Sequence, residues 1–97
     1  MANYIVLGSF TDQGLRAVRD TAKRAEDIRG MGKKVKVAVK EVYWTLGQFD
    51  VVLVVEAPDE ASVTTFSLSV CALGNVRYQT LRAFSADEMG HILGRMA

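Results

Sequence analysis

The chain has 97 residues, of which 49% are apolar and 24% are charged, and its formal net charge is +1. This length suits one two-layer core, so we expect a single domain over residues 1–97. The near-neutral balance lacks the basic excess that accompanies nucleic acid or anionic membranes, so we expect neither as a partner. The one cysteine, Cys71, excludes an internal disulfide and favours a reducing compartment.

The chain begins with MANYIVLGSF, which lacks the basic region and the long apolar region of a signal peptide. The longest uninterrupted apolar run, residues 51–55, is far too short to span a membrane. We therefore expect a cytoplasmic protein.

The first part of the chain reads as a strand followed by a helix. Residues 3–10 form a strand with an apolar centre, and Thr11 and Asp12 supply a helix N-cap. Gly30 and Gly32 weaken the helix by about 1 kcal/mol each relative to alanine, so it ends there or continues loosely. Apolar residues recur every three or four positions, which is one face of a helix. These residues are Leu15, Val18, Ala22, Ala25, Ile28, Met31 and Val35.

The remaining elements follow from the same periodicities and from their end signals. A tight turn at Gly47 joins two strands, and Ser85 with Glu88 forms the capping box of a last helix. The predicted elements are strands over residues 37–46, 51–57 and 76–84 and helices over residues 59–73 and 86–96.

This order predicts an α+β fold of the ferredoxin-like type, βαββαβ with a C-terminal helix and a four-stranded antiparallel sheet. Right-handed crossovers place the first and third strands in the centre. Those two strands are the two continuous apolar runs, which is typical of burial on both faces. Two helices cover only one face of such a sheet. We therefore expect a second copy to cover the open face, in a two-fold homodimer or a multiple of dimers.

Three stretches carry a family resemblance: YIVLGSFTDQGL, KEVYWTLGQFDVVLVVEAPD and ALGNVRYQTLRAF. They resemble the GYD domain family, small bacterial and archaeal proteins named for a Gly-x-Tyr-Asp signature. The signature positions are Gly47, Gln48, Phe49 and Asp50, with Phe49 in place of the usual tyrosine. The resemblance implies similarity to dimeric α/β-barrel proteins, which include small monooxygenases and cyclases, and it implies no particular reaction.

No stretch of the sequence matches a complete catalytic or metal-binding motif. His91 is the only histidine, so neither a zinc nor an iron site has its usual ligand set. Cys71 and His91 lie in separate predicted helices, and nothing pairs them as nucleophile and base. The glycines of residues 8–9 and 30–34 match neither phosphate-binding loop pattern. We expect no cofactor and no metal.

The best candidate for a ligand site is a group of aromatic and charged side chains. We expect Tyr43, Trp44, Asp50 and Arg77 to line it, because Tyr and Trp combine an apolar body with a polar tip. Tyr43 and Trp44 alternate, so each more simply packs in the core or at a dimer interface. Asp50 more simply accepts backbone N–H bonds in the turn. The wider group also includes Tyr4, Glu56, Tyr78 and Arg82.

Two functions fit these observations. The first is a homo-oligomeric module without catalytic activity that binds a small molecule or a partner protein. The second is a cofactor-independent enzyme resembling the small α/β-barrel monooxygenases and cyclases, with an aromatic-lined pocket. An enclosed pocket in which Trp44 or Tyr43 meets an arginine favours the enzyme, and those side chains at a subunit interface favour the module.

Overall fold

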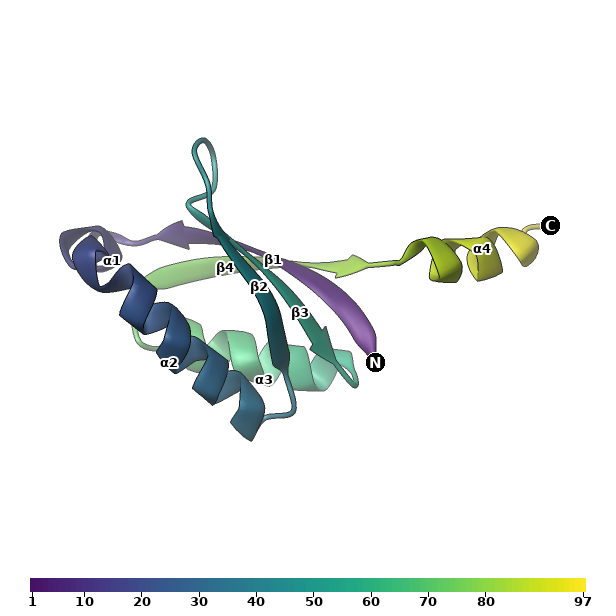
Figure 1. Cartoon of the computed structure of the whole chain (residues 1–97), viewed down its shortest axis with the longest axis horizontal. Helices are drawn as coiled ribbons and strands as arrows, with labels where there is room; N and C mark the ends of the chain where they lie inside the picture. Colours follow the sequence, from purple (N-terminus) through teal and green to yellow (C-terminus); the bar gives the residue numbers. More distant parts are fainter.

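Two helices lie on one face of a four-stranded antiparallel sheet, and a third extends away from it (Figure 1). The computed structural model describes residues 1–97, and the strand order is β2-β3-β1-β4. The strands are β1 (Ala2–Phe10), β2 (Ala38–Trp44), β3 (Val51–Ala57) and β4 (Val76–Ala83). The helices are α1 (Asp12–Arg16), η1 (Val18–Asp20, a 3₁₀ turn), α2 (Thr21–Lys34), α3 (Glu60–Cys71) and α4 (Ala86–Gly94).

This arrangement confirms the predicted α+β, ferredoxin-like pattern. The two continuous apolar strands, β1 and β3, lie in the centre of the sheet and pair with each other from Ala2↔Ala57 to Gly8↔Val51. The outer strands are β2 and β4. In β2 the pairing register shifts between Val39 and Glu41, which places a bulge at Lys40.

The predicted single helical face between residues 12 and 35 is interrupted. A break at Ala17 separates α1 from η1 and α2, and both Leu15 and Val18 are exposed rather than buried. The cause is a contact distant in sequence: the Thr11 backbone N–H donates to the Asn75 carbonyl at 3.0 Å, and the Thr11 hydroxyl donates to the Gly74 carbonyl at 2.6 Å. Since α1 is tied to the loop before β4, the chain must turn before α2 can cover the sheet.

The core lies between the sheet and the helices α2 and α3. Its largest fully buried side chains are Phe66, Val6, Val37, Val55 and Val70. The end of α2 comes so close to the start of β2 that a Cβ on Gly32 would lie 2.6 Å from the Val37 carbonyl oxygen. Glycine is therefore required at this approach.

The last helix, α4, continues beyond the end of β4 and packs on neither layer (Figure 1). The chain measures 51 Å along its longest axis and its radius of gyration is 14.5 Å. A compact chain of this length has a radius of gyration of about 12.5 Å. The difference reflects the projecting helix, which we call the α4 arm (residues 84–97).

Candidate functional site

One face of the sheet is left uncovered by the chain. Side chains alternate along each strand, so those that do not face α2 and α3 form a separate surface, which we call the open sheet face. Ile5 is opposite both Val54 and Leu81 in the pairing, and Leu7 is opposite Val52. The apolar members of the open sheet face are Ile5, Leu7, Tyr43, Val52, Val54 and Leu81, and all are half-buried or exposed.

Polar residues surround this apolar centre. Glu56 of β3 forms an ion pair with Lys40 of β2, with 3.8 Å between the Oε1 and Nζ atoms. Arg77 and Gln79 lie at the β4 side, opposite Ser9 and Leu7 in the pairing. An apolar centre with a polar rim is the usual anatomy of a protein interface.

The structure separates Tyr43 from Trp44. Tyr43 lies on the open sheet face and is 55% exposed. Trp44 lies toward the helices, where its indole Nε1–H donates to the Thr21 hydroxyl at 3.0 Å. The two aromatic rings therefore do not line one pocket.

The Asp50 backbone carbonyl accepts from the Thr45 N–H at 2.9 Å, so Asp50 lies beside the end of β2, whereas Arg77 lies apart from Tyr43 and Trp44. Asp50 accepts a hydrogen bond from the Phe10 backbone N–H at 2.9 Å, at the junction of β1 and β3. Arg77 lines a shallow groove with Phe49 on the β4 side of the sheet. Tyr43 is on β2, three strand spacings away from β4, or about 14 Å. The structure thus brings Arg77 near the turn and separates it from Tyr43 and Trp44.

A groove of about 360 Å³ lies on the helix side of the sheet, between α3 and the strands β1 and β4. We call it the α3–β4 groove. Tyr4 is 2% exposed, and its hydroxyl finds no hydrogen-bond partner in the chain. The Arg82 guanidinium lies 5.6 Å from the centre of the Tyr4 ring. The groove is lined by Tyr4, Glu60, Val63, Thr64, Ser67, Leu68, Thr80 and Arg82.

Electrostatics distinguish this groove from the rest of the surface. Burial raises the pKa of the Tyr4 phenol, the nearby Glu60 carboxylate raises it further, and Arg82 acts in the opposite direction. The phenol therefore stays protonated, and the Glu60 carboxylate is the acceptor closest at hand for its buried O–H. Sequence reasoning included Tyr4 and Arg82 in its wider aromatic and charged group. It did not join them to Glu60, because the rotation of α3 depends on tertiary packing.

The remaining titratable candidates are dispersed. Cys71 lies at the end of α3, and His91 is exposed on the α4 arm, which projects away from the body of the chain. No group of three or more His, Cys, Asp and Glu side chains lies close enough together to hold a metal ion. None of the helices has the length and apolar character needed to cross a membrane.

Comparisons with known proteins give one family. The model of the GYD domain matches residues 4–93. A protein of Thermus thermophilus named "Glutamine synthetase and cystathionine beta-lyase binding protein" is 31% identical over 90 residues, which cover 92% of this chain and 95% of that protein.

Two solved structures share the fold. A crystal structure of a Thermus thermophilus protein has a TM-score of 0.58 at 24% identity and covers 89% of this chain and 96% of that one. Part of a homoserine dehydrogenase from Thiobacillus denitrificans has a TM-score of 0.55 at 19% identity, covering 84% of this chain and 17% of that one.

Proposed function

The chain belongs to the GYD domain family, and we propose that it is a non-catalytic binding module that pairs with a second copy and holds a metabolic enzyme. The open sheet face supports the pairing. Leaving several Val, Ile and Leu side chains in water forfeits about 25 cal/mol per Å² of apolar area, and a second sheet recovers this. The partner enzyme then needs a different surface.

The outer surface of α3 supports enzyme binding, and this is the observation on which the proposal rests most. No charged residue occurs between Glu60 and Arg77. Leu68, at the middle of this surface, is 67% exposed. The exposed face of α2 carries charged residues at Lys23, Glu26 and Asp27. Interface centres are depleted of charge, so α3 is the better docking surface of the two.

The hydroxyl groups on α3 strengthen this argument. The Thr65 hydroxyl donates to the Ala61 carbonyl, and the Ser69 hydroxyl donates to the Thr65 carbonyl, both at 2.8 Å. These two donors are already satisfied inside the helix, so covering them with a partner leaves neither hydroxyl proton unpaired. The cost of desolvating these two positions is therefore low.

The partner class comes from the relative in Thermus thermophilus, whose name states that it binds glutamine synthetase and cystathionine beta-lyase. We propose that the first candidate partners for this chain are the glutamine synthetase and the cystathionine beta-lyase of the organism from which this chain comes. The experiment immobilises the purified chain and measures binding of each enzyme separately by biolayer interferometry. We expect one of them to bind with a Kd of about 1 μM or tighter, as for a standard interface.

Two matched variants locate the docking surface. Leu68→Glu adds a carboxylate in the middle of the α3 surface, and Ala22→Glu adds the same carboxylate at an exposed position of α2. We expect the first to weaken enzyme binding at least about tenfold and the second to leave it unchanged. Equal binding by both variants would contradict the α3 placement. No binding of either enzyme to the wild-type chain would contradict the proposal as a whole.

A second candidate function is small-molecule binding, as in a cofactor-independent enzyme, and the unpaired Tyr4 hydroxyl in the α3–β4 groove favours it. The Tyr4 hydroxyl is buried, so a ligand oxygen would need to enter the groove beside Arg82 and displace the side chains that cover it. Native mass spectrometry of the gently purified chain tests this: we expect a small-molecule adduct that Tyr4→Phe removes without loss of fold. If both the wild-type chain and Tyr4→Phe show only the unliganded mass, the result contradicts small-molecule binding.

A further inference from the structure

The α4 arm carries an apolar stripe that nothing in its own chain covers. Met89, Ile92 and Leu93 recur at helical spacing, Met96 follows just beyond the end of the helix, and these four side chains are 39% to 71% exposed. Asp87, His91 and Arg95 occupy the opposite side of the helix. A helix with this division buries its apolar side against another element.

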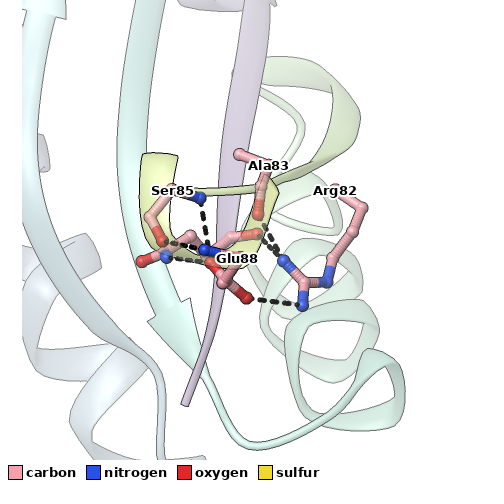
Figure 2. A network of polar contacts seen from close by, with 5 residues as sticks. Arg82, Ala83, Ser85 and Glu88 are labelled. Atoms are coloured by element: carbon pink, nitrogen blue, oxygen red, sulfur yellow. Dashed lines mark hydrogen bonds and ion pairs between the residues drawn. The ribbon is translucent and has the colours of Figure 1, made fainter. Parts of the chain in front are cut away.

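The arm is nevertheless attached in a defined direction, as Figure 2 shows. Glu88 Oε1 accepts hydrogen bonds from the Ser85 backbone N–H at 2.9 Å and from Asn3 Nδ2 at 3.2 Å. Its Oε2 accepts from Arg82 at 3.4 Å. Arg82 also donates to the Asn3 carbonyl at 3.2 Å and to the Ala83 carbonyl. These bonds join the first turn of α4 to the ends of β1 and β4, so the stripe is held out from the sheet.

On its own, α4 is a poor helix in water. It spans Ala86–Gly94, whereas isolated helices shorter than about 12 residues are marginal even with favourable sequences. Gly90 and Gly94 weaken it further, and neither contacts anything that would exclude a side chain. The helix therefore needs an apolar surface against its stripe.

The exposed area of the chain indicates what supplies that surface. A folded monomer of this mass exposes about 5,500 Å², whereas this chain exposes 6445 Å². The surplus of about 1,000 Å² is close to the roughly 800 Å² that each partner buries in a standard interface. Leu81, at the β4 side of the open sheet face, and Phe84, whose ring stacks under the Arg82 guanidinium at 4.5 Å, are also exposed close to where the arm begins.

We infer that the α4 arm reaches across to a second copy of the chain and packs its apolar stripe there, while the partner's arm returns the same contact. The inference rests on the homodimer proposed above, and it adds that the pair is held by exchanged arms as well as by sheets. A two-fold axis makes both contacts equivalent, so each apolar stripe is covered once and none remains for a third copy.

Spin labelling tests the exchange directly. In a Cys71→Ser background, Arg95→Cys carries a nitroxide at the end of the arm, and this chain is refolded together with ¹⁵N-labelled Cys71→Ser chains. We expect a contiguous set of amide signals in the ¹⁵N-labelled copies to broaden. Adding Ile92→Glu to the spin-labelled chain should abolish this broadening, whereas the matched His91→Glu, on the polar side of the same helix, should preserve it.

Sedimentation equilibrium on the same proteins separates the two proposals. We expect Ile92→Glu to weaken dimerisation by about a hundredfold, since a buried Ile is lost twice per dimer, and His91→Glu to leave it unchanged. A dimer without intermolecular broadening, in which both variants dimerise alike, overturns the arm exchange and spares the sheet dimer. A monomeric wild-type chain overturns both. If the nitroxide broadens no signals of the ¹⁵N-labelled copies, and the α4 signals change only when a partner enzyme is added, the exchange is also overturned.

Discussion

The carboxylate of Asp50 accepts a hydrogen bond from the backbone N–H of Phe10, with 2.9 Å between Oδ2 and N. The backbone N–H of Asp50 in turn donates to the Gly8 carbonyl at 2.8 Å. One residue of the turn thus satisfies two groups of β1 and sets where β3 begins. Asp50, the acidic residue of the family signature, therefore has a structural role in joining β1 to β3.

Replacing Asp50 by alanine should lower the free energy of unfolding by about 1–2 kcal/mol, because the half-buried Phe10 N–H loses its acceptor. Asp50→Asn keeps one oxygen acceptor and should cost less. Urea denaturation followed by circular dichroism measures both. Unchanged stability together with lost partner or ligand binding would instead assign Asp50 to the binding site.

Two glycines of α2 should respond in opposite directions to alanine. Gly30→Ala should raise stability by about 0.5–1 kcal/mol, because a Cβ there meets nothing within 4 Å and alanine favours the helix. Gly32→Ala should lower it by about 1–3 kcal/mol, because the new Cβ collides with the Val37 carbonyl. Thermal unfolding of the pair checks the prediction. Equal shifts would show that α2 does not approach β2 as closely as described.

Val54 lies near the middle of the open sheet face, between Ile5 and Glu41 in the pairing. Val54→Lys should convert the proposed dimer into a folded monomer, because it places a charge in the centre of the proposed interface. Ala22→Lys adds the same charge on exposed α2 and should leave the dimer intact. Sedimentation velocity at micromolar concentration measures both. A dimer that survives Val54→Lys would exclude this face from the contact.

The hydrogen bonds of Glu88 that hold the α4 arm to the ends of β1 and β4 should weaken in acid. The hydrogen bond from the Ser85 backbone N–H is the main cause that lowers the pKa of Glu88 below its ordinary value of 4.5, with Ser85 Oγ, Arg82 and Asn3 adding to it. A lowered pKa means that the stabilisation is present above the ordinary value and is lost as the pH falls through the folded value. The amide shifts of Ser85 and α4 should therefore move toward random-coil values below about pH 4.5.

Glu88→Gln is the control for this titration. The amide side chain does not ionise, so the arm signals of this variant should show no transition in the acid range. A transition of equal size in Glu88→Gln would assign the acid response to another group.

The sequence carried enough information to predict the element order and the strand positions. The bounds of β3 agree with the predicted residues 51–57, since apolar runs and turn residues are local signals. The break at Ala17 was not predictable in the same way, because it depends on bonds between α1 and the loop before β4. A helix ending near residue 96 was predicted, but periodicity says nothing of where such a helix lies.

The candidate site was also predictable only where local sequence signals decide the structure. Alternation along β2 predicted that Tyr43 and Trp44 face opposite ways, and the structure places them so. It could not show that Tyr4 and Arg82 share a groove with Glu60, because these residues come from three elements that meet only after packing. The absence of charge between Glu60 and Arg77 can be read from the sequence, but which of these residues form an exposed surface depends on which side of α3 faces the sheet.

The bulge at Lys40 also bears on how large the assembly can become. A regular outer strand with unpaired N–H and C=O groups is a template onto which further chains can add. In β2 the shifted register between Val39 and Glu41, with a lysine at the irregular position, spoils that template. Addition of further chains along the β2 edge is thereby disfavoured, which limits the proposed assembly to contacts through the open sheet face and the α4 arm.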